Sequence, residues 1–151
     1  MAQPSLKNAP LLTADELRGR LGEFQTAVAQ FNDGYYFKSH ETLEDLWMVT
    51  PLPDRDFFQA VIQLAAAFVH FVRGEYPGTL KLLAAAADKF RAFSPEHLGV
   101  DVAALLRETE QAHAEIAALG PERFTGWDES RAPHIELRPE ALPRRGGRAL
   151  A

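Results

Sequence analysis

The feature that most constrains the fold is a run of sixteen residues without a charged side chain, FFQAVIQLAAAFVHFV, from Phe57 to Val72. A transmembrane helix needs about 20 predominantly apolar residues, so this run is too short, and two glutamines and a histidine make it too polar. Apolar side chains fall on nearly every side of the helix that it would form, which is typical of a buried helix. The run therefore predicts a helix at the centre of a globular fold.

Helical periodicity and helix-ending signals place this helix among four others. Thr13 and Glu16 have the spacing of a capping box, and Asp54 and Asp101 are predicted to cap later helices. No alternating strand pattern is present. The chain is therefore predicted to be all-α, a compact five-helix bundle of two helical hairpins plus a covering helix, with an irregular C-terminal tail. The predicted helices span about 13–32, 35–48, 55–73, 77–93 and 101–119.

These elements divide the chain into three parts. An N-terminal extension covers residues 1–12, the helical domain covers 13–120, and a tail rich in Pro, Gly and Arg covers 121–151. Ile135 and Leu137 are predicted to pin a short extended piece of the tail to the body. Beyond Pro139 the composition predicts disorder.

Charge and composition limit the classes of partner. The net charge is −5, and the basic cluster Arg144, Arg145 and Arg148 is confined to the C-terminus, whereas nucleic-acid binders usually carry a basic stripe. We therefore expect no nucleic-acid partner, and the short apolar run predicts no membrane span. The chain has no cysteine, which fits a reducing compartment, and no secretory signal is visible, so a cytoplasmic protein is expected.

A short motif occurs twice, 40 residues apart. Phe31-x-x-Gly34-x-Tyr36 returns as Phe71-x-x-Gly74-x-Tyr76, and each copy joins one predicted helix to the next. The glycine can adopt the left-handed geometry that ends a helix. Helix pairs with such turns are typical of repeat proteins, but two copies are fewer than a solenoid needs. The motif therefore predicts two similar hairpins.

The second helix carries polar side chains on a side that should be apolar. His40 and Glu44 lie one turn apart, in the arc that also holds Tyr36 and Trp47. On the central helix the single polar stripe contains glutamine, alanine and histidine rather than long charged side chains. The two stripes are predicted to face each other. The candidate ligand-binding residues are therefore His40, Glu44, Gln63 and His70, with Glu41 and Gln59 at the rim and Trp47 as a wall.

Three interpretations of this cluster remain open. The groups can form a purely structural hydrogen-bond network, because buried polar groups must be paired. They can bind a small molecule or an anion. They can also hold a metal ion, for which the candidate ligands are His40, Glu44 and His70. The sequence HETLE is not a zincin motif, since Glu44 stands where a second histidine is required.

The same residues carry a resemblance to a known family. The run from Phe31 to Trp47, with Gly34, Phe37, His40-Glu41 and Leu43-Glu44, resembles the signature of the bacterial and archaeal domain-of-unknown-function family numbered 309. Arg55-Asp56-Phe57-Phe58-Gln59, Ile62-Gln63-x-Ala65-x-Ala67, His70 and Arg73-Gly74 resemble its second block, although Ala60 stands where glycine is typical. The resemblance covers roughly residues 20–93. It implies a small, soluble, all-helical domain with His40, Glu41, Glu44, Trp47, Gln63 and His70 on motif positions, and it implies no activity.

Two functions follow from these observations. The first is a helical module whose His/Glu/Gln cluster binds a small ligand or ion, with the question of enzymatic activity left open. The alternative is a protein-interaction scaffold in which the cluster only fixes the packing. A cluster open to solvent at Glu44 favours the first, and a sealed network beside an exposed apolar groove favours the second. Homo-oligomer formation is open under both.

Overall fold

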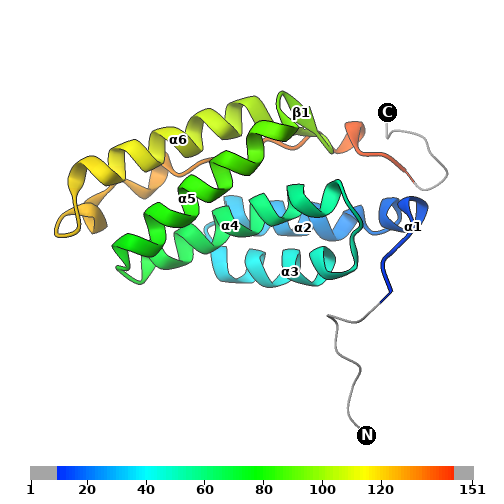
Figure 1. Ribbon diagram of the computed structural model, residues 1–151, viewed down its shortest axis with the longest axis horizontal. Helices are drawn as coiled ribbons and strands as arrows, with labels where there is room; N and C mark the ends of the chain where they lie inside the picture. Colours follow the sequence, from blue (N-terminus) through cyan, green and yellow to red (C-terminus); the bar gives the residue numbers. More distant parts are fainter. Residues whose placement is uncertain (1–9, 145–151) are drawn as a thin grey trace, which may run out of the picture.

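The computed structural model describes residues 10–144 and is mainly helical (Figure 1). Consecutive helices from α2 to α6 pack against one another, and the long helix α4 lies between α3 and α5. The apolar run predicted to be buried forms most of α4, which supplies nine buried side chains. The helices are α1 (Ala14–Arg18), α2 (Leu21–Asn32), α3 (Tyr36–Val49), α4 (Asp54–Val72), α5 (Tyr76–Phe90) and α6 (Val102–Leu119).

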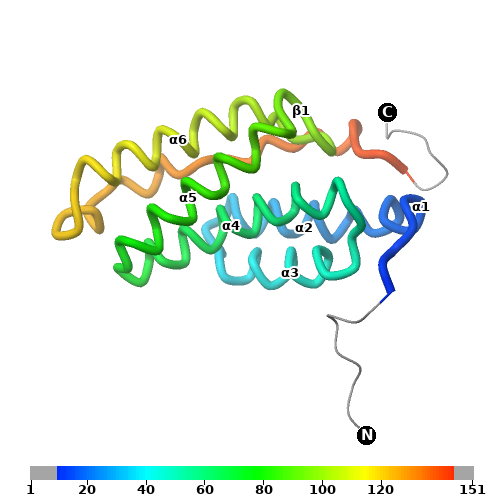
Figure 2. The backbone as a smooth tube through the Cα atoms, in the orientation of Figure 1, coloured from blue at the N-terminus to red at the C-terminus, as the bar shows by residue number. Residues whose placement is uncertain are grey.

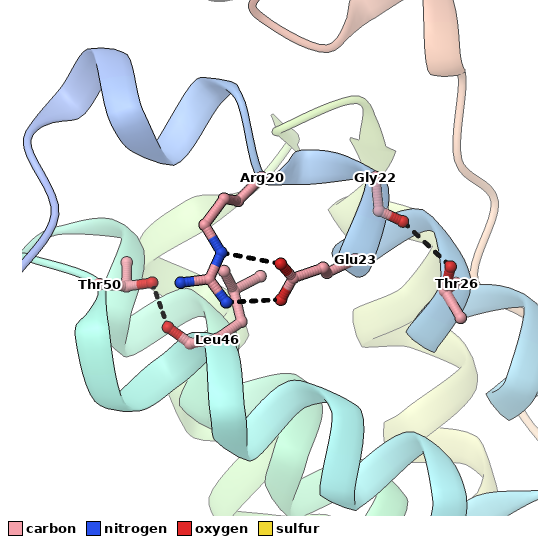
Figure 3. Close-up of polar contacts among 6 residues, drawn as sticks. All are labelled: Arg20, Gly22, Glu23, Thr26, Leu46 and Thr50. Atoms are coloured by element: carbon pink, nitrogen blue, oxygen red, sulfur yellow. Dashed lines mark hydrogen bonds and ion pairs between the residues drawn. The ribbon is translucent and has the colours of Figure 1, made fainter. Parts of the chain in front are cut away.

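The prediction of one helix over 13–32 is wrong, because this segment forms two helices, which makes six α-helices in residues 10–144 rather than five. The predicted capping box at Thr13 and Glu16 starts α1. Arg20 then leaves helical geometry, with φ −109° and ψ 4°. Its guanidinium donates to both carboxylate oxygens of Glu23, each at 2.8 Å, across the start of α2 (Figure 3).

The two copies of the repeated motif form matching turns. Gly34 and Gly74 both have positive φ, 86° and 74°, as predicted for residues that end a helix. The backbone N–H of Tyr35 donates to the carbonyl of Gln30, and that of Glu75 donates to the carbonyl of His70, at the same offset. These turns join α2 to α3 and α4 to α5, so α3 begins and α4 ends at the same end of their hairpin (Figure 1).

A small β-hairpin follows α5 and the 3-10 helix η2 (Arg91–Phe93). Strands β1 (Glu96–His97) and β2 (Val100–Asp101) pair antiparallel, and Val100 also forms a bridge with Leu137. The expectation of no strand is therefore wrong at this point. Two residues per strand are too few to show alternation in a sequence. Asp101 caps α6 as predicted, accepting from the backbone N–H of Ala104.

The segment after α6 runs back along the body of the molecule (Figure 2). Its backbone is held at Ile135, whose N–H donates to the side-chain oxygen of Asn32 and whose carbonyl accepts from the Asn32 amide. Four of its large apolar side chains are buried. The segment is therefore held to the body at residues before and after Ile135 as well as at Ile135 itself. The four buried side chains are Phe124, Trp127, Ile135 and Leu142.

The structure differs from the sequence expectation just beyond Pro139. The 3-10 helix η5 covers Pro139–Ala141, and Leu142 is buried in the core, because its apolar side chain closes the end of the bundle near α1. The predicted disorder therefore does not begin at Pro139; residues 145–151 lie outside the described part. Within residues 10–144, no helix combines the length and the apolar character that a bilayer crossing requires.

Candidate functional site

The polar strip on α3 is present and accessible. The Nδ1 atom of His40 lies 3.6 Å from an Oε atom of Glu44, one helical turn away, and the side chains are 29% and 43% exposed. At 3.6 Å this is an ion-pair distance and too long for a hydrogen bond. The ring of Phe37 stacks on the imidazole, with 6.3 Å between the centroids. The strip therefore has polar atoms free to bind another group.

Trp47 and Arg55 close one end of the strip, where α3 ends and α4 begins. The guanidinium carbon of Arg55 lies 4.4 Å from the centroid of the Trp47 ring, which is the geometry of a cation–π contact. The Nε1 atom of Trp47 and the Nε atom of Arg55 are both buried, and neither has a hydrogen-bond partner among residues 10–144. Two hydrogen-bond donors are thus held without an acceptor.

The central helix adds an acceptor. The Oε1 atom of Gln63 is buried and also lacks a hydrogen-bond partner in the described chain. Gln59, one turn earlier on α4, is half-buried. Because α3 and α4 are packed side by side, the predicted meeting of their polar stripes is compatible with the packing. We call the set His40, Glu44, Trp47, Arg55, Gln59 and Gln63 the α3–α4 strip.

His70 has other partners. Its Nδ1 atom lies 3.0 Å from an Oε atom of Glu75, in the turn after α4. Gly78 on α5 leaves room for the ring, since a Cβ atom at that position would lie 2.7 Å from the same nitrogen. No three His, Asp or Glu side chains in residues 10–144 form a group that could hold a metal ion. The set His40, Glu44 and His70 is therefore not arranged as a metal centre.

Glu41 follows His40 on α3 and is exposed. It lines an apolar pocket of about 400 Å³ between the start of α3 and the end of α4. The exposed side chains Tyr35, Phe37 and Val72 line the same pocket. Sequence reasoning assigned Glu41 to the polar cluster and missed the pocket. The signal was available in the repeated turns, which bring the start of one helix and the end of the next together.

A second polar contact was missed as well. The Nε2 atom of His97, in β1, lies 2.6 Å from an Oδ atom of Asp54. The imidazole packs against Phe57 and Phe93, with both ring centroids 4.8 Å away. Asp54 is the first residue of α4, and Pro53 rather than Asp54 is its N-cap. A carboxylate and a histidine 43 residues apart leave no local pattern that would pair them.

Comparison with protein-family models gives a match for the central part of the chain. The family model described as Domain of unknown function (DUF309) matches residues 24–82, which include α3 and α4 in full. No curated protein and no solved structure matches the chain.

Proposed function

Because residues 24–82 belong to the DUF309 family, whose description names no activity, we propose a function from the site: a module that binds a small polar ligand in the α3–α4 strip. The ligand carries an oxyanion, such as a carboxylate, and at least one hydrogen-bond donor. The residues proposed to contact it are His40, Glu44, Trp47, Arg55, Gln59 and Gln63.

The observation that carries this proposal is the set of unpaired atoms on the strip. Trp47 Nε1, Arg55 Nε and Gln63 Oε1 are buried without a hydrogen-bond partner in residues 10–144. Each such group costs about 1–3 kcal/mol of stability. Buried polar groups without partners are rare in folded proteins, and an ordered water, an ion or a bound molecule can supply the partner.

The chemistry of the three atoms indicates the class of ligand. Trp47 and Arg55 offer N–H donors, one of them charged, and a charge-assisted bond to an oxyanion is roughly twice as strong as a neutral one. Gln63 offers an acceptor for a hydroxyl or amine of the same ligand. His40 and Glu44, at the more exposed edge, can form further hydrogen bonds with it. We propose no reaction.

The exposure of Glu44 supports this function over the interaction scaffold. A sealed network beside an exposed apolar groove would favour the scaffold. The chain does carry an exposed apolar pocket, but the network is not sealed, because the carboxylate of Glu44 is 43% exposed and its imidazole neighbour lies beyond hydrogen-bond distance. A metal ion has less support than an oxyanion, since structural and catalytic zinc sites use at least three protein ligands. The described residues of the strip offer a histidine and a carboxylate within one turn.

The test combines native mass spectrometry with thermal unfolding. Native mass spectrometry gives the mass of protein purified without chelator or metal columns and shows whether a ligand is bound. The thermal unfolding midpoint is then measured with malate, citrate, serine and phosphate. We expect a midpoint rise with at least one hydroxy acid or amino acid, and its loss in Gln63→Met and Trp47→Phe. Gln25→Met, on α2, is the matched control and should keep the rise. A response that survives in both strip variants would exclude this site.

A further inference from the structure

The apolar pocket between the start of α3 and the end of α4 is lined by several exposed hydrophobic side chains. Tyr35, Phe37 and Val72 line it and are 65%, 55% and 64% exposed, and Val69 contributes further apolar wall. Single exposed apolar residues are common on protein surfaces, whereas several that line one concave site indicate binding. These side chains come from two helix ends that the repeated turns bring together.

The rim of this pocket carries an excess of positive charge. Lys38 and Arg73 both line it, and neither forms an ion pair within residues 10–144. Other arginines of the chain do pair with carboxylates, as Arg20 does with Glu23 and Arg131 with Glu115. Glu41 is the one acidic residue of the lining. Two cations and one carboxylate leave a local excess of one positive charge in a chain whose net charge is −5.

We propose that this pocket binds a small amphipathic monoanion, a hydrocarbon chain or an aromatic ring that carries one carboxylate or sulfonate. The apolar part lies against Tyr35, Phe37 and Val72, and the anionic group lies between Lys38 and Arg73. The volume of about 400 Å³ falls in the range of small-molecule pockets, roughly 300–1,000 Å³. The lining also has their composition, mainly aromatic and aliphatic with a few polar groups.

This site is separate from the α3–α4 strip. Of the residues proposed to contact the polar ligand, none lines the pocket. The two sites also select different chemistry, since the strip presents hydrogen-bonding atoms and the pocket presents apolar surface. Phe37, which lines the pocket, stacks on His40 of the strip, so controls are taken from the other residues of each site. With that choice each proposal can fail without the other.

The experiment uses the full chain and a fluorescent probe of the proposed class, 8-anilinonaphthalene-1-sulfonate. The probe should bind the folded protein, and octanoate should displace it. Octylammonium has the same chain length and the opposite charge, and it should displace the probe more weakly. Equal displacement by the two compounds would overturn the proposal. No displacement by octanoate would also overturn it and would favour a partner protein as the occupant of the apolar surface.

Variants then locate the binding. Val72→Asp should weaken octanoate binding at least roughly tenfold, because it removes the contact of one aliphatic side chain and adds a negative charge beside the bound anion. Leu52→Asp is the matched control, since Leu52 is 68% exposed in the loop at the other end of the α3–α4 hairpin. Lys38→Gln with Arg73→Gln should weaken binding by roughly threefold per cation, the effect of an exposed charge. The control variant, Lys81→Gln with Arg107→Gln, removes two cations outside the pocket and should leave octanoate binding unchanged.

Circular dichroism confirms that each variant is folded. Tyr35→Ser replaces Val72→Asp as the test if the latter unfolds, since Tyr35 is equally exposed. An affinity that falls no further in the pocket variants than in their matched controls would also overturn the proposal.

Discussion

Asp54 and His97 hold the first turn of α4 to the β-hairpin through a contact of 2.6 Å between carboxylate oxygen and imidazole Nε2. The two side chains are about one quarter exposed, and two phenylalanine rings flank the imidazole. This contact joins residues on either side of α5. It therefore stabilises the arrangement of the central helix against the second half of the chain.

We expect His97→Phe to lower the free energy of unfolding by about 1–3 kcal/mol. The new ring can keep the contacts with Phe57 and Phe93, but the half-buried carboxylate of Asp54 loses its partner. His134→Phe is the control, because His134 is 61% exposed and its contact with Glu136 is 3.5 Å long. Urea unfolding measures both variants. Equal losses in the two would mean that the Asp54 contact adds nothing.

Gln63→Met is expected to stabilise the protein in the absence of ligand, by about 1 kcal/mol. Methionine nearly matches the shape of glutamine and removes the buried acceptor that has no partner. Gains of this kind at the cost of function are common where a site is built for binding. Thermal and urea unfolding of the ligand-free variant and wild type show whether the free energy of unfolding rises or falls. A loss of stability would indicate that Gln63 already has a partner, such as an ordered water.

Glu44→Gln is expected to change the free energy of unfolding by less than about 0.5 kcal/mol. The carboxylate is 43% exposed and 3.6 Å from His40, and such surface pairs contribute little. A purely structural network would instead lose about 1–3 kcal/mol, the value of a hydrogen bond to a charged group. A loss of that size would restore the structural interpretation of the strip.

Tyr36 should make the protein sensitive to alkali. Burial, with a smaller contribution from the charge of Glu129, raises the pKa of Tyr36 to about 12 from 10.0. The neutral phenol is favoured in the folded state, so its contribution is complete below pH 10 and is lost as the pH rises from 10 to 12. The loss is up to about 2–3 kcal/mol, at 1.4 kcal/mol per pKa unit. Tyr36→Phe should unfold at higher pH than the wild type, and equal alkaline midpoints would contradict this.

Glu115 should keep its contacts well into the acid range. Hydrogen bonds from Arg131 and then Trp127 lower the pKa of Glu115 to about 2 from 4.5. Its stabilising contribution is present above pH 4.5 and is lost as the pH falls towards 2. Trp127 fluorescence, measured in a Trp47→Phe background, should therefore change near pH 2 and remain constant through 4.5. Glu115→Gln should abolish this transition, and a midpoint near 4.5 in the wild type would contradict the assignment.

Much of the helical framework can be predicted from the sequence because its signals are local. The buried run of α4, the cap of α6 at Asp101 and the turns at Gly34 and Gly74 each depend on residues within a few positions of one another. The break at Arg20 could not be predicted in this way. The apolar periodicity continues through it from Leu17 to Leu21, and both leucines are buried.

The site was predicted less well than the fold, for a related reason. Helical spacing identifies which side chains share a face, and α3 and α4, which carry His40, Glu44 and Gln63, do pack against each other. That these side chains meet stays a prediction. Helical spacing does not give the offset between two helices along their axes. It also does not show that the turn after α4 brings Glu75 and Gly78 beside His70. The Asp54–His97 contact depends on a loop path of the same non-local kind.

The aromatic contacts of the C-terminal segment have a consequence for the limits of the family. Trp127 packs on Phe68 and Phe71 of α4, with ring centroids 6.1 and 5.7 Å apart, and Asn32 of α2 bonds the backbone at Ile135. The matched segment, residues 24–82, contains one side of each contact and lacks the other. A fragment cut at its ends would expose the rings of α4 to water and lose the last turns of α5. The boundary set by sequence likeness is thus narrower than the packed unit that this chain forms.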